Sequence, residues 1–178
     1  MFKAKPDLNL DRLDRNHPGG RSPLGHAASN GHTSTCQALV GYGANVNFHD
    51  LSNRGPLTYA IQGGHVAICR LLLDRGANTQ PVLPREQSPL VTAACQRDHR
   101  LCQLLLDHGA EVNYQERGGR TALIFGAERG LFRVCQHLIK RGANLNSVDN
   151  DGLSALHYAA FEGHATIVRL LLARGADP

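Results

Sequence analysis

The stretch that decides the fold is residues 149–164, Asp-Asn-Asp-Gly-Leu-Ser-Ala-Leu-His-Tyr-Ala-Ala-Phe-Glu-Gly-His, with residues 165–177, Ala-Thr-Ile-Val-Arg-Leu-Leu-Leu-Ala-Arg-Gly-Ala-Asp, after it. It contains a turn, a short helix, a second turn, a longer apolar helix and a terminating Gly-Ala pair. The same pattern recurs upstream in steps of 33 residues, with Gly-Ala pairs beginning at Gly43, Gly76, Gly109, Gly142 and Gly175. Self-similarity at one fixed period indicates a repeat protein.

Each unit carries the sequence signals of two helices. The first helix begins after a residue suited to cap it, at Ser22, Gly55, Ser88, Thr121 and Ser154. Glycine ends that helix in four units, where a left-handed residue is favoured, at Gly31, Gly64, Gly130 and Gly163. The second helix is apolar at helical spacing, as in Ile68, Cys69, Leu72 and Leu73. We therefore expect helix pairs, joined by extended links that project as two-stranded fingers.

These units resemble ankyrin repeats. Ser22-Pro-Leu-Gly-His-Ala-Ala, Ser88-Pro-Leu-Val-Thr-Ala-Ala and Ser154-Ala-Leu-His-Tyr-Ala-Ala are similar to the Thr-Pro-Leu-His-x-Ala-Ala signature of that family. Gly31-His32, Gly64-His65 and Gly163-His164 match its inter-helix turn. The resemblance implies an all-α repeat solenoid, an ankyrin-repeat stack of antiparallel helix pairs with β-hairpin-like fingers. It places the fingers and first helices on a concave binding side.

The resemblance covers five units. We expect ankyrin repeats at residues 17–49, 50–82, 83–115, 116–148 and 149–178. Residues 1–16 are either an N-terminal tail or the degenerate start of a repeat, and the sequence favours neither. The fifth unit keeps a fully apolar second helix, so we expect the array to continue beyond residue 178, since an uncapped solenoid end exposes core-type surface.

Composition excludes several classes of protein. The chain has 178 residues, 42% hydrophobic, and a formal net charge of +4. Its charge is not concentrated as in a nucleic-acid binder, so no nucleic-acid partner is expected. It lacks a run of 18 apolar residues and the apolar segment of a signal peptide. We expect no membrane insertion, a monomer, and an intracellular, cytoplasmic or nuclear location.

Four of the five cysteines occupy one repeat position, at Cys36, Cys69, Cys102 and Cys135. Val168 occupies that position in the fifth unit, which predicts a small buried apolar site. Equivalent side chains of stacked repeats lie roughly 10 Å apart, too far for disulfides or a shared metal. Cys95 stands alone, and a reduced thiol is expected there.

The ten histidines do not form a metal or catalytic motif. His32 and His65 precede Cys36 and Cys69 by four residues, a spacing that could suit zinc. However, His32, His65 and His164 share one repeat position, where the family's histidine has a structural role in the turn. Neither a nucleophile elbow nor a phosphate-binding glycine loop is present. We predict no catalytic, cofactor-binding or metal residues, and no cofactor.

The third unit departs from the pattern. It has Arg97-Asp98 where other units have Gly-His or Gly-Leu, and its incoming finger, residues 80–87, contains Pro81 and Pro84. Each proline removes a backbone donor, so we expect this finger to pair poorly. Two interpretations stay open: drift in a tolerant loop, or a finger specific to a partner.

Arginines recur where the family binds its partners. Arg21, Arg54 and Arg120 share one finger position, and the fourth unit adds Arg117 and Arg129. Arginine suits carboxylates and phosphates, and an exposed aromatic beside such a cluster is typical of a hot spot. The candidate partner-binding residues are Arg21, Arg54, Arg117, Arg120, Arg129, Leu153, Phe161 and Glu162. The alternative is scattered, solvated charge on a mildly basic protein.

The resemblance also implies a possible modification. Leucine eight residues before asparagine is similar to the targets of intracellular asparaginyl hydroxylase, and this pattern occurs at Asn47, Asn113 and Asn146. The surroundings of Asn113 fit most closely.

The sequence predicts a non-catalytic protein–protein interaction module. It would hold a segment of a partner protein, acidic or phosphorylated, across its concave face, as an adaptor or scaffold. Two alternatives place the effector outside these residues: the substrate-recruiting arm of a larger enzyme or ubiquitin-ligase adaptor, and a membrane or cytoskeletal scaffold.

Overall fold

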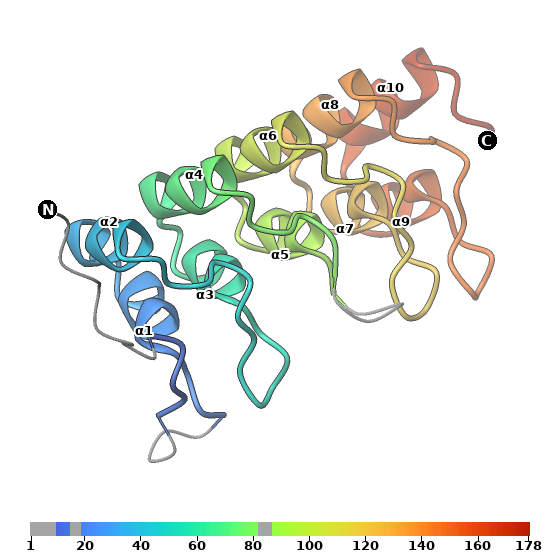
Figure 1. The fold of residues 1–178 in the computed structure, drawn as a ribbon. Helices are drawn as coiled ribbons and strands as arrows, with labels where there is room; N and C mark the ends of the chain where they lie inside the picture. The colour runs from blue at the N-terminus through green and yellow to red at the C-terminus, as the bar shows by residue number, and fades with distance from the viewer. Residues whose placement is uncertain (1–9, 15–18, 82–86) are drawn as a thin grey trace, which may run out of the picture. The chain divides into compact units, whose positions relative to one another are not determined.

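The computed structural model describes residues 10–14, 19–81 and 87–178. Within these ranges the chain is all-α, with helices paired along the sequence (Figure 1). The chain divides into two compact blocks, an N-terminal block of residues 1–77 and a C-terminal block of residues 78–178. Each block repeats one motif: a short helix, a tight turn, a longer helix and an extended finger.

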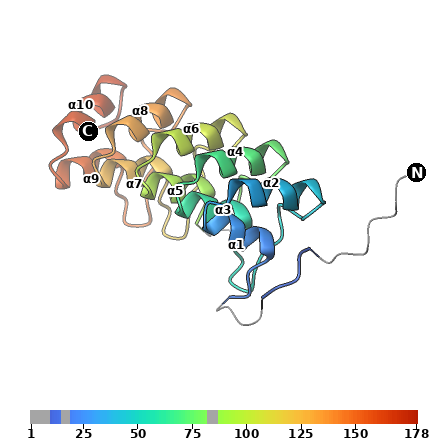
Figure 2. The same ribbon diagram turned by 90° about the vertical axis from the view of Figure 1, so that its left-hand side faces the viewer.

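The N-terminal block contains two helix pairs. They are α1 (Pro23–Ser29) with α2 (Thr33–Gly41) and α3 (Pro56–Gln62) with α4 (Val66–Asp74). The short helices α1 and α3 pack side by side, as do α2 and α4, so one pair stacks on the other in two layers (Figure 2). Leu24, Ile61, Ile68 and Leu72 are fully buried between the layers.

The C-terminal block contains three helix pairs. They are α5 (Pro89–Cys95) with α6 (His99–Asp107), α7 (Ala122–Glu128) with α8 (Phe132–Lys140), and α9 (Ala155–Phe161) with α10 (Ala165–Ala173). Short helices form one row and longer helices another, and Leu105, Leu123 and Leu138 are fully buried between them. The all-α repeat fold expected from the sequence is confirmed.

The predicted helix starts are confirmed. The hydroxyl of Ser22 accepts a hydrogen bond from the Gly25 N–H at 3.1 Å, and Ser88 and Thr121 cap α5 and α7 in the same way. In the fifth repeat, Ser154 forms a capping box in which His157 takes the reciprocal position. Each cap satisfies a backbone donor that the first turn leaves free.

The four repeated cysteines are buried, as predicted for a small apolar site. Cys36, Cys69, Cys102 and Cys135 have no exposed surface, and all five cysteines are free thiols. Burial raises the pKa of the Cys102 and Cys135 thiols to about 12 each, which keeps them protonated and unreactive.

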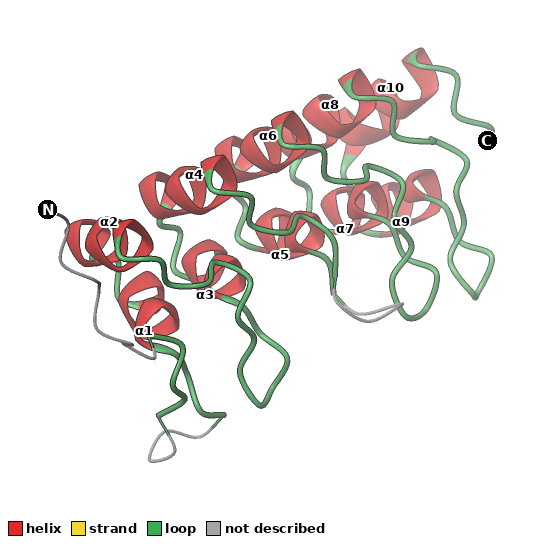
Figure 3. Ribbon diagram, in the orientation of Figure 1, coloured by secondary structure: helices red, strands yellow, loops and turns green. Residues whose placement is uncertain are grey.

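The fingers are held by side chains more than by a β-ladder. Among the described residues the extended pairing is one isolated bridge, Val148 with Ser154, so the fingers are loops (Figure 3). The Asp149 carboxylate accepts hydrogen bonds from the Asp151 and Leu153 N–H groups at 3.0 Å each, which closes the turn. The finger of the third repeat, residues 80–87, was predicted to pair poorly. Pro81 is described, but Pro84 and most of that finger lie outside the described residues.

The described part of the N-terminal segment contacts the first repeat. The Asp11 carboxylate accepts a hydrogen bond from the Asn45 N–H at 3.0 Å, and the Asp14 N–H donates to the Arg21 carbonyl at 2.9 Å. No helix in the described ranges is long and apolar enough to cross a bilayer.

Arg97 occupies the left-handed position that glycine fills in the other repeats. Its φ is 62°, whereas the equivalent Gly64 and Gly130 have φ of 70°. Because a side chain in this region costs about 1–2 kcal/mol, Arg97→Gly is expected to raise the free energy of unfolding by about 1 kcal/mol in denaturant titrations. Gln96→Gly, one residue earlier at φ −76°, is the control and should not stabilise the protein. Equal effects of the two substitutions would contradict the prediction.

Candidate functional site

The predicted binding arginines differ in how free their guanidinium groups are. In the N-terminal block, Arg21 stacks on the ring of Tyr59 at 4.1 Å from the ring centroid and donates to the Ser29 hydroxyl at 3.1 Å. Arg54, the exposed arginine of the next finger, lies 5.7 Å from the same centroid. Arg21 is therefore engaged within the fold, and Arg54 keeps a solvent-facing group.

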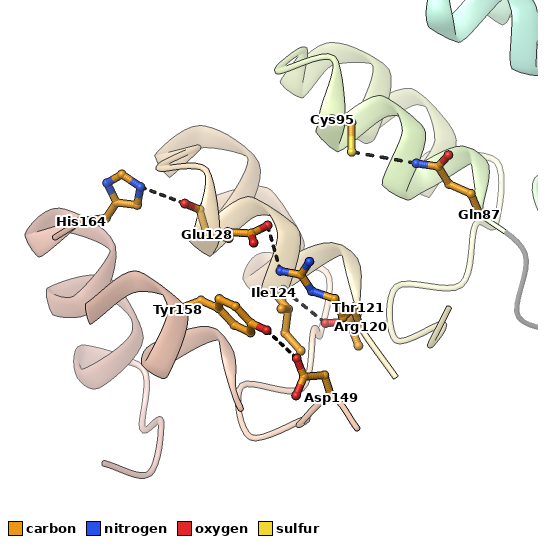
Figure 4. A network of polar contacts seen from close by, with 9 residues as sticks. All are labelled: Gln87, Cys95, Arg120, Thr121, Ile124, Glu128, Asp149, Tyr158 and His164. Carbon is orange, nitrogen blue, oxygen red and sulfur yellow. Dashed lines mark hydrogen bonds and ion pairs between the residues drawn. The ribbon is translucent and has the colours of Figure 1, made fainter. Parts of the chain in front are cut away.

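Arg120 is the most enclosed of the predicted residues. Its guanidinium lies 4.4 Å from the ring centroid of Phe125 and 4.7 Å from that of Tyr158. It also pairs with Glu128 at 2.8 Å, and 23% of its side chain is exposed (Figure 4). The two rings cover the guanidinium, and its Nε and Nη2 atoms are buried, so little of this arginine is open to a ligand.

The aromatic rings that receive the arginines occupy one repeat position, which the sequence reasoning missed. Tyr59, Phe125 and Tyr158 are equivalent residues of their repeats. The Tyr158 hydroxyl donates to Asp149 at 2.7 Å, and Tyr59 donates to Asp50 in the same way. The sequence did contain a signal for these contacts, because the finger arginines and the aromatic residues each recur at one fixed repeat position. Arg21 and Arg120 thus each link one repeat to the next.

Arg117, Arg129, Phe161 and Glu162 are exposed, and Leu153 is half-buried. Arg129 caps the C-terminus of α7, and Phe161 and Glu162 end the adjacent α9. The two helix ends lie together because His164 forms a hydrogen bond of 3.1 Å with the Glu128 carbonyl (Figure 4). We call Arg129, Phe161 and Glu162 the helix-end patch. Phe161 is 87% exposed, the highest value among the exposed large hydrophobic residues of the described ranges.

Two of the three histidines at this repeat position, His65 and His164, have the structural role in the turn that the resemblance implied. His65 reaches the Ser29 carbonyl at 3.2 Å, and His164 reaches Glu128 in the equivalent place. Each ring therefore ties a turn to the preceding repeat. In the part of the chain that the structure describes, no three His, Cys, Asp or Glu side chains are grouped to hold a metal ion.

Glu116 is a buried acid in the fourth finger. It stands where Asp50 and Asp149 stand in other repeats, but its longer side chain reaches the Ser88 N–H, with an Oε1–N distance of 2.7 Å. Burial raises the pKa of Glu116 to about 7, although the Ser88 hydrogen bond and the charge of Arg120 lower it. This carboxyl is therefore partly protonated near neutral pH.

A comparison with protein families accounts for this arrangement. The family model described as ankyrin repeats (3 copies) matches residues 4–82 and 90–178, which is most of the chain. The chain belongs to the ankyrin-repeat family. A search of curated proteins finds no match. Ankyrin repeats are generally protein–protein interaction modules, and such domains are typically non-catalytic.

The three asparagines predicted as hydroxylation targets connect consecutive ankyrin repeats. Asn47 donates to the Gly76 carbonyl at 3.0 Å, and Asn113 donates to the Gly142 carbonyl at 3.2 Å. Asn113 also accepts from the Asn144 N–H at 2.7 Å, and Asn146 contacts Asp177. Their hydroxylation stays a prediction, which intact-mass measurement of protein from cells can test.

Proposed function

We propose that the protein binds an acidic or phosphorylated segment of another protein on the finger side of its C-terminal block. The helix-end patch supplies the anchor, and Arg117 and Leu153 on the fingers extend the surface. Arg54 offers a further exposed guanidinium in the N-terminal block. Arg21 and Arg120, whose groups are engaged, act by positioning the fingers.

The observation that carries the proposal is the exposure of Phe161 at the end of α9, which is adjacent to the end of α7 where the exposed Arg129 lies. An exposed ring is costly in water, and an arginine next to it can pair with a carboxylate or phosphate while the ring is covered. Hot spots combine these residue types. A surface built on packed helices also loses little entropy on binding.

The proposal also covers the oligomeric state of the protein and the class of its partner. The protein acts as a monomeric adaptor or scaffold, with neither nucleic acid nor a membrane as its partner. The partner is recognised by its negative charge and by an apolar group that covers Phe161.

Affinity capture from lysate with cross-linking tests the proposal. The double variant Arg117→Glu, Arg129→Glu is expected to reduce capture of the partner about tenfold or more, because each reversal replaces an attraction with a repulsion. Cross-links should join the C-terminal block to a segment rich in Asp, Glu or phosphorylated residues.

The matched control is Arg70→Glu, Arg75→Glu, which changes two exposed arginines of the N-terminal block. It should retain the partner, while Phe161→Ser should lose it. Equal capture by the wild type and the Arg117→Glu, Arg129→Glu variant would contradict the proposal. Arg120 is left unchanged, because its loss would perturb the fold.

A further inference from the structure

A basic groove lies on the row of longer helices in the C-terminal block. Its volume is about 340 Å³, and it is lined by Gln136, His137 and Lys140 of α8 and by Arg174 at the end of α10. We call it the α8–α10 groove. None of the described residues that line it carries a carboxylate, and its size falls within the range of small-ligand sites.

The repeat pattern explains why this groove is basic. In the preceding step, Arg141 pairs with Asp107 at 2.5 Å and donates to the Leu106 carbonyl at the end of α6. One repeat later, the equivalent residues are Arg174 and Lys140. The two residues that form an ion pair between α6 and α8 are thus replaced by two cations between α8 and α10. Within the described residues, neither Lys140 nor Arg174 forms an ion pair.

We propose that the α8–α10 groove binds the phosphate group of a phosphorylated serine or threonine in a partner protein. Lys140 and Arg174 supply the positive charge that a phosphate dianion requires. The bound phosphate would take the role that the Asp107 carboxylate has in the preceding repeat. The arginine fork and the lysine ammonium offer several donors to its three terminal oxygens, and the Gln136 amide adds another. A single carboxylate would neutralise one cation only.

His137 contributes a fixed imidazole to one wall of the groove. Its Nδ1 lies 2.9 Å from the Arg133 carbonyl oxygen, which can only accept, so Nδ1 carries the hydrogen. Its ring also contacts that of His99 in a tilted arrangement, with the ring centroids 5.7 Å apart and the ring planes at 42°. These contacts hold the ring in place before a ligand arrives, which lowers the entropic cost of binding.

The surroundings favour a single phosphate group over an anionic membrane. Asp107 is the equivalent of Lys140 on α6, and 52% of its side chain is exposed on the same row of helices. A flat anionic surface would lie across that Asp107–Arg141 pair, which has no net charge, whereas a phosphorylated side chain would reach the two cations of the groove alone. The proposal is independent of the helix-end patch, which belongs to the row of short helices.

NMR titration of the full chain tests the proposal. The probe is N-acetyl-O-phosphoserine amide, and N-acetylserine amide is its uncharged control. Saturable shifts are expected at Gln136, His137, Lys140 and Arg174 with the phosphorylated probe alone. Lys140→Asp, which restores the carboxylate of the preceding repeat, and Arg174→Gln should each weaken binding about tenfold or more.

Two controls make the result decisive. Circular dichroism confirms that both variants fold, and Arg117→Glu, Arg129→Glu should leave the shifts unchanged, which separates this site from the proposed function. Absence of shifts, shifts centred on Arg117 and Arg129, or shifts that persist in both groove variants would overturn the proposal. A further result would also overturn it: the protein binds vesicles of phosphatidylcholine and phosphatidylserine, Lys140→Asp abolishes that binding, and the phosphoserine probe does not bind.

Discussion

Arg120→Ala is expected to lower the free energy of unfolding by about 3 kcal/mol, a large effect for a residue on a finger. The guanidinium lies between the rings of Phe125 and Tyr158 and pairs with Glu128. Each cation–π contact contributes about 0.5–2 kcal/mol, and the partly exposed ion pair adds up to about 1 kcal/mol. The alanine would also leave a gap between two repeats, because the arginine stem covers apolar surface.

Denaturant unfolding followed by circular dichroism measures this effect. Arg117→Ala is the matched control: it removes an exposed arginine of the same finger and should change stability by less than about 0.5 kcal/mol. Arg120→Lys keeps the charge but not the planar stacking, and should fall between the two. An Arg120→Ala protein as stable as Arg117→Ala would show that the stacked geometry contributes nothing.

The periodicity of the sequence predicted repeated helix pairs, and the resemblance to ankyrin repeats implied how these pairs stack. A step of 33 residues, with caps and glycines at fixed positions, specifies each helix locally, and packing one pair on the next needs no long-range information. Ser22, Ser88 and Thr121 cap their helices as expected. Arg97 shows the limit of this reasoning, because the repeat imposes a left-handed turn on a residue that disfavours it.

The roles of the finger arginines could not be predicted in the same way. Arg117 and Arg120 belong to the same finger, yet one is exposed and the other is stacked between two rings. The difference depends on Tyr158, which belongs to the next repeat. Arginines at equivalent repeat positions therefore share a backbone position, but the repeat pattern does not predict which residues their side chains contact. The exposure of Phe161 likewise depends on what packs against α9.

Glu116→Gln is expected to remove a pH dependence of stability. Because burial raises the pKa of Glu116 from 4.5 to about 7, the native state binds this proton more tightly than the unfolded chain does. The stabilisation from this proton is therefore fully present below the unfolded pKa and is lost as the pH rises through about 7. Glutamine resembles the protonated carboxyl and keeps an oxygen for the Ser88 N–H, so its contribution should not change with pH.

The measurement is the free energy of unfolding of both proteins between about pH 4.5 and pH 8. Relative to Glu116→Gln, the wild type should lose about 2 kcal/mol across this interval, the order of magnitude that a rise in pKa from 4.5 to about 7 implies. Contributions from the rest of the chain are the same in both proteins and cancel in the difference between them. Glu111→Gln, at an exposed acid of the same repeat junction, should follow the wild type. If Glu116→Gln also parallels the wild type, the carboxyl is ionised throughout, and the fourth finger has no proton-sensitive contact with Ser88.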